Sequence, residues 1–178
     1  TLAEVVSRVL GHAYVCPTHN SLGAVKLIVR ALTPPGSAVA SNARGRVDIH
    51  APRGIDIVDV RDHAAAPFSG NVDLARLEAV LADERTAIVG MQCYADGQHP
   101  FSLANLAAVR ALAERRGRRL VLDVSRVIEN AHFIQRHEAG QATRTIADLV
   151  KQIAKTAHIV LMDGAQDPKC NTGGFLAT

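Results

Sequence analysis

The sequence contains little of several things that would assign a protein to a class at once. It has no tryptophan and only 3% aromatic residues, so few rings are available to stack on nucleic-acid bases. No apolar run reaches about 18 residues, and we therefore expect no membrane-spanning segment. The three cysteines, at positions 16, 93 and 170, lack the paired spacing of a zinc site. We expect no nucleic-acid partner, no membrane partner and no bound metal.

The cysteines also indicate the compartment in which we expect the protein. An odd number of cysteines, without a secretory pattern at the start of the chain, is typical of reduced thiols in the cytoplasm. Cys93 follows an apolar run, where packing near a strand end is the simplest role for it. A catalytic thiol is the alternative, although the sequence assigns no base to it.

What the sequence does contain is enough apolar material for one folded domain over residues 1–178. Hydrophobic residues make up 48% and charged residues 21%, which argues against disorder. Helical periodicity alternates with short runs that are apolar at consecutive positions. This alternation predicts an α/β fold of three layers (α/β/α), in which helices cover both faces of a mainly parallel sheet.

The pattern also predicts where the elements lie. Ligands of open parallel sheets bind beyond the carboxyl ends of the strands, so residues 18–23, 91–94, 123–126 and 163–169 are the candidate site segments. Helices are expected at 2–10, 22–32, 73–81, 103–116 and 146–155, and strands at 13–16, 37–40, 55–60, 86–91, 120–123 and 158–162.

Residues 121–134, Val-Leu-Asp-Val-Ser-Arg-Val-Ile-Glu-Asn-Ala-His-Phe-Ile, are the most informative segment. An apolar strand brings Asp123 to its end, where an unpaired buried carboxylate would be costly. The protonated ring nitrogen of pyridoxal phosphate (PLP) is one partner that fits, and Arg126 would then reach the phenolic oxygen of the ring. The alternative is that Asp123 caps a helix and Arg126 is a surface residue.

This segment, with residues 135–140, resembles the tryptophanase and tyrosine phenol-lyase family of β-eliminating lyases. Residues 17–24, 96–106 and 173–176 extend the resemblance over almost the whole chain. It implies the large domain of a fold-type I PLP enzyme, truncated so that the N-terminal arm and the C-terminal small domain are absent. It also implies an amino-acid-like substrate, and a homodimer or a place in a larger polypeptide.

One departure concerns the lysine that forms the Schiff base. The Ser-x-Lys-Lys-Asp of the family reads here as residues 163–167, and Gln166 falls on the Schiff-base position. A glutamine amide cannot form that bond, whereas an amine can. Lys169, three positions further on, is the candidate replacement. The alternative for Lys169 is a solvated loop lysine, because lysines are mostly exposed.

Other departures concern the phosphate. The resemblance implies that it is held where a strand ends and a helix begins, at residues 18–23, because backbone N–H groups converge there. Leu22 replaces the phosphate-binding arginine of the family. Asp163 replaces a phosphate-binding serine and would repel a phosphate dianion.

The remaining candidates divide into two sets. His19 is either a general base or a histidine at a helix start, where the N-terminus disfavours its cation. Tyr94 stands where the family has an asparagine near the ring oxygen, and Gly45 stands near the ring-stacking position. Asn171 matches the family. The candidate catalytic residues are Lys169 and His19, and the candidate cofactor-binding residues are Asp123, Arg126, Thr18, Asn20, Ser21, Tyr94 and Gln166.

Two functions of different classes remain open. The first is a PLP-dependent β-eliminating lyase, in which the protonated ring serves as the electron sink. A thiolate departs without strong acid assistance, so a C–S bond of a cysteine-like substrate is the expected target, in a domain of a biosynthetic assembly line. The second is a catalytically degenerate domain that keeps the lyase fold and has a structural or interaction role. The replaced lysine, arginine and serine favour the second function. The retained Asp123 and Arg126 favour the first, because they have little structural purpose without a ring to hold, and the lyase is therefore the function that we expect.

Overall fold

The computed structural model describes residues 1–43, 54–170 and 172–178. Their strands form one seven-stranded sheet in the order β1-β7-β6-β5-β4-β2-β3. The strands are β1 (Val15–Thr18), β2 (Ala38–Ser41), β3 (Asp56–Asp59), β4 (Thr86–Gln92), β5 (Arg119–Asp123), β6 (Ile159–Asp163) and β7 (Gly174–Ala177). The helices are α1 (Leu2–Leu10), α2 (Ser21–Leu32), α4 (Leu74–Leu81), α5 (Leu103–Arg115), α6 (Val127–His137) and α7 (Ile146–Thr156).

The sheet is mainly parallel, as the sequence predicts. Strands β2 to β6 pair in parallel, while β7 is antiparallel to both of its neighbours, β6 and β1. Because β7 reverses the direction twice, β1 runs the same way as β6. The carboxyl ends of all the described strands except β7 therefore lie at one edge of the sheet.

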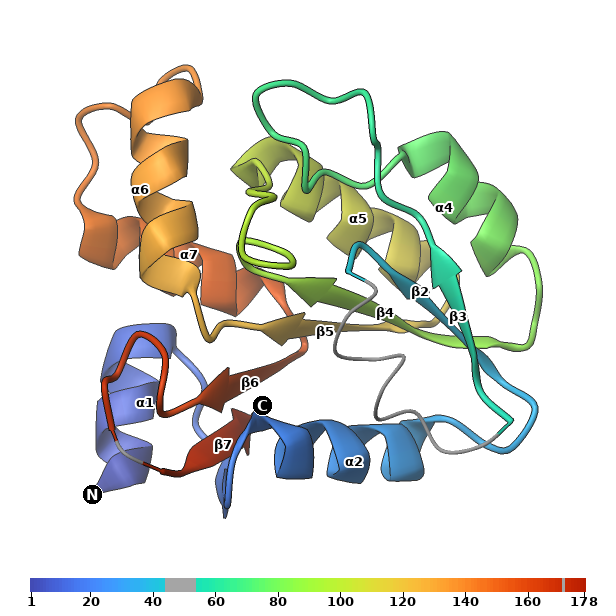
Figure 1. Cartoon of the computed structure of the whole chain (residues 1–178), viewed down its shortest axis with the longest axis horizontal. Helices are drawn as coiled ribbons and strands as arrows, with labels where there is room; N and C mark the ends of the chain where they lie inside the picture. The colour runs from blue at the N-terminus through green and yellow to red at the C-terminus, as the bar shows by residue number, and fades with distance from the viewer. Residues whose placement is uncertain (44–53, 171) are drawn as a thin grey trace.

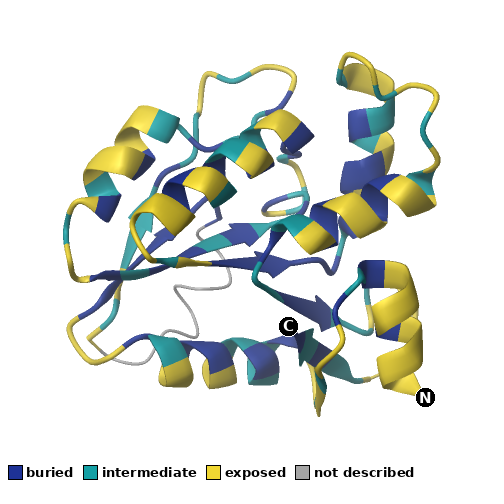
Figure 2. Cartoon of the chain, turned by 180° about the vertical axis from the view of Figure 1, so that it is seen from behind, coloured by how far each residue is buried: buried dark blue, intermediate teal, exposed yellow. Residues whose placement is uncertain are grey.

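The helices lie on both faces, which confirms the predicted three layers (Figure 1). Among the described helices α2 alone packs on one face, where Ala24 and Ile28 contact apolar residues of β2, β4, β5 and β6. The other helices pack on the opposite face around a larger apolar core. Both faces of the central strands are buried (Figure 2). Each fully buried aliphatic side chain contributes about 1.5–3 kcal/mol, so these two cores account for most of the stability.

Most helix ends follow from local sequence. Asp73 and Ser102 accept hydrogen bonds at the starts of α4 and α5 from the backbone N–H three residues later. Gly11 ends α1 in the left-handed conformation, with a φ of 83°. The predicted elements are all present, with boundaries that differ by up to a few residues.

Two elements were not predicted, α6 and β7. The N-cap position of α6 is Arg126, whose side chain makes no capping hydrogen bond. The side chain of Asp167, 39 residues further along the chain, accepts a hydrogen bond from the Ile128 N–H at 2.7 Å instead. Strand β7 has only four residues and is fixed by pairing on both sides. Neither signal can be seen in a local stretch of sequence.

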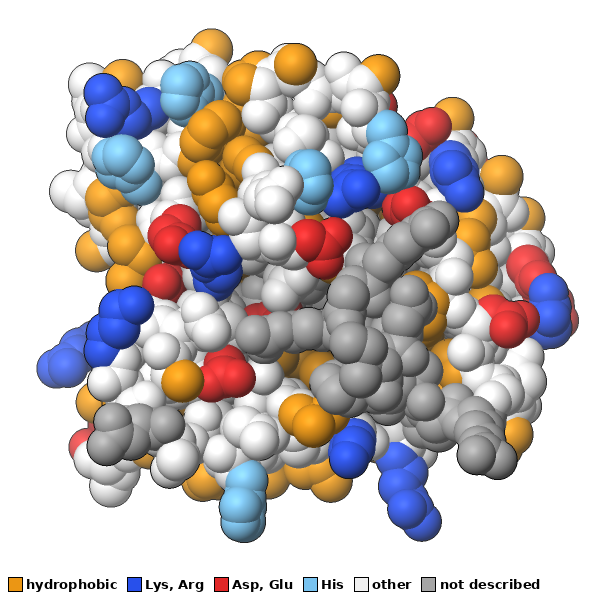
Figure 3. Space-filling model, in the orientation of Figure 1, with side chains coloured by type: hydrophobic (Ala, Val, Ile, Leu, Met, Phe, Trp, Pro, Cys, Tyr) orange, Lys and Arg blue, Asp and Glu red, His pale blue; other side chains and the backbone are white. Residues whose placement is uncertain are grey.

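The outer surface mixes charges of both signs. On the face drawn in Figure 3, basic, acidic and histidine side chains of the described residues are interspersed. None of the described helices combines the length and the apolar character that crossing a membrane would require.

Candidate cofactor site

Four of the predicted segments meet at the carboxyl edge of the sheet. The strand register places Thr18 of β1, Gly174 of β7 and Asp163 of β6 in one row. On the neighbouring strands, Gln92 of β4 lies beside Asp123 of β5. The carboxyl edge of the sheet, where ligands of such folds bind, therefore brings together residues that are far apart in the sequence. Thr18 and Asp163, for example, are 145 positions apart (163 minus 18).

Asp123 is the last residue of β5 and is only 8% exposed. Its Oδ1 accepts a hydrogen bond from the Ser125 backbone N–H at 2.9 Å and another from the Ser125 hydroxyl. Because Asp123 ends a strand and Arg126 occupies the N-cap position of α6, the alternative in which Asp123 caps a helix is wrong.

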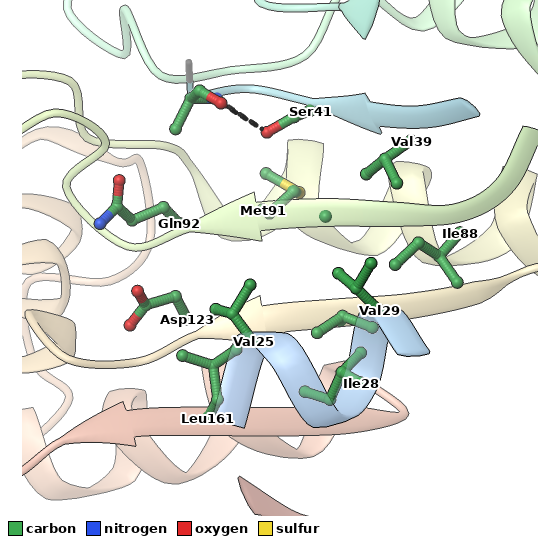
Figure 4. A pocket seen from close by; sticks show the side chains of 13 residues that line it. Val25, Ile28, Val29, Val39, Ser41, Ile88, Met91, Gln92, Asp123 and Leu161 are labelled. Atoms are coloured by element: carbon green, nitrogen blue, oxygen red, sulfur yellow. Dashed lines mark hydrogen bonds between the residues drawn. The ribbon is translucent and has the colours of Figure 1, made fainter. Parts of the chain in front are cut away.

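Asp123 lines a cavity between α2 and the sheet (Figure 4). Asp123 and Gln92 lie at the end toward which the strands point, with Ser41 on the neighbouring strand. The rest of the wall is mostly apolar, so the carboxylate lies at the polar end of an apolar slot. The apolar lining comprises Val25, Ile28, Val29, Val39, Ile88, Met91, Val121 and Leu161.

Arg126 is held by two other side chains. Its Nη2 donates to Oε1 of Glu129 at 2.8 Å, and its Cζ lies 5.3 Å from the ring centroid of Tyr94. The hydrogen bond with Glu129 raises the pKa of the guanidinium, which stays protonated. Beside it, Gly97 has a φ of 75°, which favours glycine, and a Cβ there would lie 2.6 Å from the movable end of Arg126, at Nη1. Neither Arg126 nor Tyr94 is among the described residues that line the cavity.

The turn before α2 uses its polar groups within the protein. The Thr18 hydroxyl donates to the carbonyl of Asn20 at 2.8 Å, and Oδ1 of Asn20 caps α2 by accepting from the Gly23 N–H at 2.9 Å. The Ser21 hydroxyl donates to Oδ2 of Asp163 at 2.8 Å. His19 is exposed, and its carbonyl accepts from the Gly173 N–H at 2.9 Å.

Ser125 connects these groups, and the sequence reasoning missed it. Its buried hydroxyl donates to Asp123 and accepts from the Asp163 backbone N–H at 2.8 Å. Three hydrogen bonds thus lead from Asp123 through Ser125 and Asp163 to Ser21. A serine two residues after a strand-end aspartate is a common turn partner, and this spacing could have identified part of the path.

The loop at 163–170 contains Gln166 and Lys169, the two residues that the sequence suggests for the position of the Schiff-base lysine. Gln166 is half-buried, whereas the side chain of Lys169 is exposed and its backbone φ is 57°. Asp167 fastens the loop to α6, because its N–H donates to the Ser125 carbonyl at 3.1 Å and its carboxylate accepts from Ile128. Burial raises the pKa of the Asp167 carboxyl. Because the side chain of Lys169 is exposed, the structure supports the alternative in which Lys169 is a solvated loop lysine. Gly45 and Asn171 lie outside the described residues.

These groups allow a test of whether PLP fits. The ring end does, since a buried carboxylate stands at the polar end of an apolar slot. The phosphate end does not, because the carboxylate of Asp163 is hydrogen-bonded to Ser21 in the turn where the family resemblance places the phosphate. Two unit charges 4 Å apart near a protein surface repel by about 4 kcal/mol. The residues present therefore do not fit the whole cofactor. Within the described residues, no cluster of His, Cys, Asp and Glu could hold a metal ion.

Buried Cys93 gives no nucleophile. It is 0% exposed, and burial raises the pKa of its thiol well above the ordinary value. A thiol of this kind is protonated at neutral pH and out of reach of a substrate. The thiol alternative for Cys93 is therefore wrong, and packing accounts for the residue.

Comparison with known proteins supplies the family. The family model of the β-eliminating lyases matches residues 1–178. The chain is 34% identical over 189 residues to a tyrosine phenol-lyase of Symbiobacterium thermophilum, covering 99% of this chain and 41% of that protein. It is also 34% identical over 184 residues to a tryptophanase of Rhodobacter capsulatus, covering 97% of this chain and 40% of that protein.

A solved structure confirms the fold. A chain of the SepCysS–SepCysE N-terminal domain complex superposes with a TM-score of 0.71 at 16% identity, over 99% of this chain and 44% of that one. The present chain spans about two fifths of the length of the curated relatives named above. The match over the full chain and the identity to two lyases lead to one conclusion: the chain belongs to the β-eliminating lyases, a family of PLP-dependent enzymes.

Proposed function

We propose that this chain is a catalytically degenerate β-eliminating-lyase domain with a structural or interaction role. One observation carries the proposal: residue 166, where the family resemblance places the Schiff-base lysine, is a glutamine, and the lysine of the same loop, Lys169, is exposed. The amide nitrogen of glutamine is not nucleophilic, so position 166 cannot supply the amine that the family chemistry needs.

The phosphate end supports the same proposal. Leu22 stands where the family has an arginine, and the polar groups of the turn at Ser21 are already bonded within the protein. Loss of the amine alone would leave a domain that still binds the cofactor. A domain that no longer performs catalysis is expected to lack both the amine and the phosphate-binding groups of the turn at residues 18–23.

An exposed apolar surface supports the interaction role. The outer side of α1 exposes Leu2, Val5 and Val9 by 45%, 47% and 44%, and Tyr14, four residues after the end of α1 (14 minus 10), is 78% exposed. Contiguous exposed apolar residues are a feature of surfaces that bind another protein chain. We propose that this surface contacts a second copy of the chain, as a homodimer, or another part of a larger cytoplasmic polypeptide.

The absorbance spectrum of the purified protein mixed with PLP tests the proposal. We expect no visible band that borohydride bleaches, and no sulfide release from cysteine. Gln166→Lys restores an amine at the critical position and serves as the comparison variant. A bleachable band and turnover in the wild type would overturn the proposal.

A second candidate is an active lyase that cleaves the C–S bond of a cysteine-like substrate as part of a biosynthetic assembly line. The observation in its favour is the buried Asp123 at the polar end of an apolar cavity. The amine would then come from Lys169, with His19 as the base beside the site. Lys169→Ala should abolish any turnover, while Lys151→Ala, which removes another exposed lysine on α7, should leave it unchanged.

A further inference from the structure

The start of α2 already has an anion bound to it, and the anion belongs to the protein. Oδ2 of Asp163 accepts a hydrogen bond from the Ser21 hydroxyl at 2.8 Å. Ser21 is the first residue of α2, where the partial positive charge of the helix favours negative groups. Ser21 is 5% exposed, so this contact is shielded from solvent on the side of the hydroxyl.

The carboxylate is held in place from both sides. The Ala165 N–H donates to Oδ1 of Asp163 at 2.9 Å, and the backbone N–H of Asp163 donates to the Ser125 hydroxyl at 2.8 Å. Both oxygens of Asp163 are therefore bonded, one to its own loop and one to α2. The position of the charge is set by the fold and not by a free side chain in solvent.

The residue between β6 and β1 makes this contact feasible. Gly174 lies between Asp163 and Thr18 in the strand register. A Cβ on Gly174 would come within 2.8 Å of the Asn20 carbonyl carbon and 3.0 Å of the Ser21 nitrogen. Only a glycine lets the three strands and the first turn of α2 approach this closely, and this approach brings Asp163 to Ser21.

We infer that Asp163 is an internal substitute for a phosphate and is the residue that excludes phosphorylated ligands from this end of the site. It takes the hydrogen-bond donor of Ser21 and puts a negative charge where a phosphate would bind. Like charges at contact distance oppose binding, and the fixed bonds of Asp163 prevent it from moving aside. Asp163 places this charge at the start of α2 whether or not the chain performs catalysis.

Two substitutions test it. Asp163→Ser removes the charge and supplies a hydroxyl. Asp163→Asn removes the charge and nearly keeps the shape of the side chain: its amide oxygen can still accept from the Ala165 N–H, while its amide nitrogen replaces the oxygen that accepted from Ser21 and can donate to the Ser21 hydroxyl instead. The second variant keeps the proposal testable if the first does not fold. Asp167→Asn is the matched control, because it removes a carboxylate from the same loop that caps α6 and does not contact α2. Circular dichroism establishes that each variant is folded.

Calorimetric titrations with inorganic phosphate, PLP and pyridoxal, which lacks the phosphate, give the result. We expect the wild type to bind PLP no more tightly than pyridoxal and to show no heat with phosphate. Either Asp163 variant should bind phosphate, and should bind PLP at least tenfold more tightly than the wild type does. The inference is overturned if both folded variants ignore phosphate, if Asp167→Asn gives the same gain, or if the wild type already prefers PLP tenfold.

The outcome is separate from that of the proposed function. All of these variants keep Gln166, so a gain in phosphate binding says nothing about the missing amine. A bleachable visible band together with turnover in the wild type would overturn the degenerate-domain proposal. The phosphate titrations would still decide the role of Asp163.

Discussion

Replacing Asp167 should separate its two effects on stability, the cap that it provides and the charge that it buries. Its carboxylate accepts from the Ile128 N–H at 2.7 Å, at the start of a helix whose own N-cap residue provides no side-chain bond. Removing an N-cap acceptor costs about 1 kcal/mol, within a range of about 0.5–2 kcal/mol. Asp167→Ala should therefore lower the free energy of unfolding by about 1 kcal/mol, which is about 2–4 °C in Tm for a domain of this size.

Asparagine ranks with aspartate as a cap, so Asp167→Asn should stay within about 0.5 kcal/mol of the wild type at neutral pH. Its dependence on pH is informative. Because burial raises the pKa of Asp167, the folded state holds a proton that the unfolded state has already released. The stability that this additional proton gives the folded state is fully present below the pKa of Asp167 in the unfolded chain. It is lost as the pH rises through the higher pKa of Asp167 in the folded protein. Acidification through that window should stabilise the wild type relative to Asp167→Asn.

Urea unfolding followed by circular dichroism measures both effects, and hydrogen exchange reports on the loop at 163–170. Asp73→Ala, which removes the local cap of α4, gives the reference cost of losing a cap on this protein. If Asp167→Ala were as stable as the wild type, the hydrogen bond from Ile128 to Asp167 would make no contribution to the free energy of unfolding. If Asp167→Asn were as unstable as Asp167→Ala, the charge and not the acceptor would be what matters.

Three further predictions concern the interior and the surface. Asn130→Ala removes the oxygen that accepts two backbone N–H groups, at a residue that is 0% exposed. The free energy of unfolding in urea should fall by about 2–4 kcal/mol, because both donors lose their partner in the interior. A loss below about 1 kcal/mol would refute the role of Asn130 in satisfying these donors. Gly174→Ala places a Cβ 2.7 Å from a carbonyl oxygen and should lower Tm strongly, while Gly23→Ala, with its nearest neighbour at 3.6 Å, should not; equal effects would show that crowding is not the cause. Val5→Glu should weaken any self-association seen by sedimentation, and a wild type that stays strictly monomeric at high concentration would contradict the dimer.

Local signals were enough for most of the fold. Asp73 and Ser102 act as caps because a side-chain oxygen reaches the N–H three residues on, within one turn. Consecutive apolar residues in β4 and β5 indicate a sheet that is covered on both faces. Since parallel strands end at one edge, the sequence predicts that the site segments lie together.

Long-range contacts decided the rest. Helix α6 was not predicted although Val127, Ala131 and Ile134 recur at helical spacing, because its start has no local cap and Asp167 supplies one from elsewhere in the chain. Strand β7 was not predicted because its four residues are fixed by pairing with β6 and β1. Ser125 was missed for a related reason. One of its bonds is local, to Asp123, but the other goes to Asp163 on a neighbouring strand.

The sequence by itself determined the chemistry that position 166 can offer, because an amide lacks a nucleophilic nitrogen in any fold. It also determined that position 163 has a carboxyl group and, through the resemblance, that this group belongs to the phosphate end of the site. Only the tertiary structure decided which donors that carboxyl contacts. Asp163 and Ser21 are 142 residues apart, and they meet because β7 enters the sheet between β6 and β1 with a glycine at the level of both. Without a side chain at Gly174 the carboxylate can reach the first turn of α2, and a contact of this kind depends on packing that no local pattern encodes.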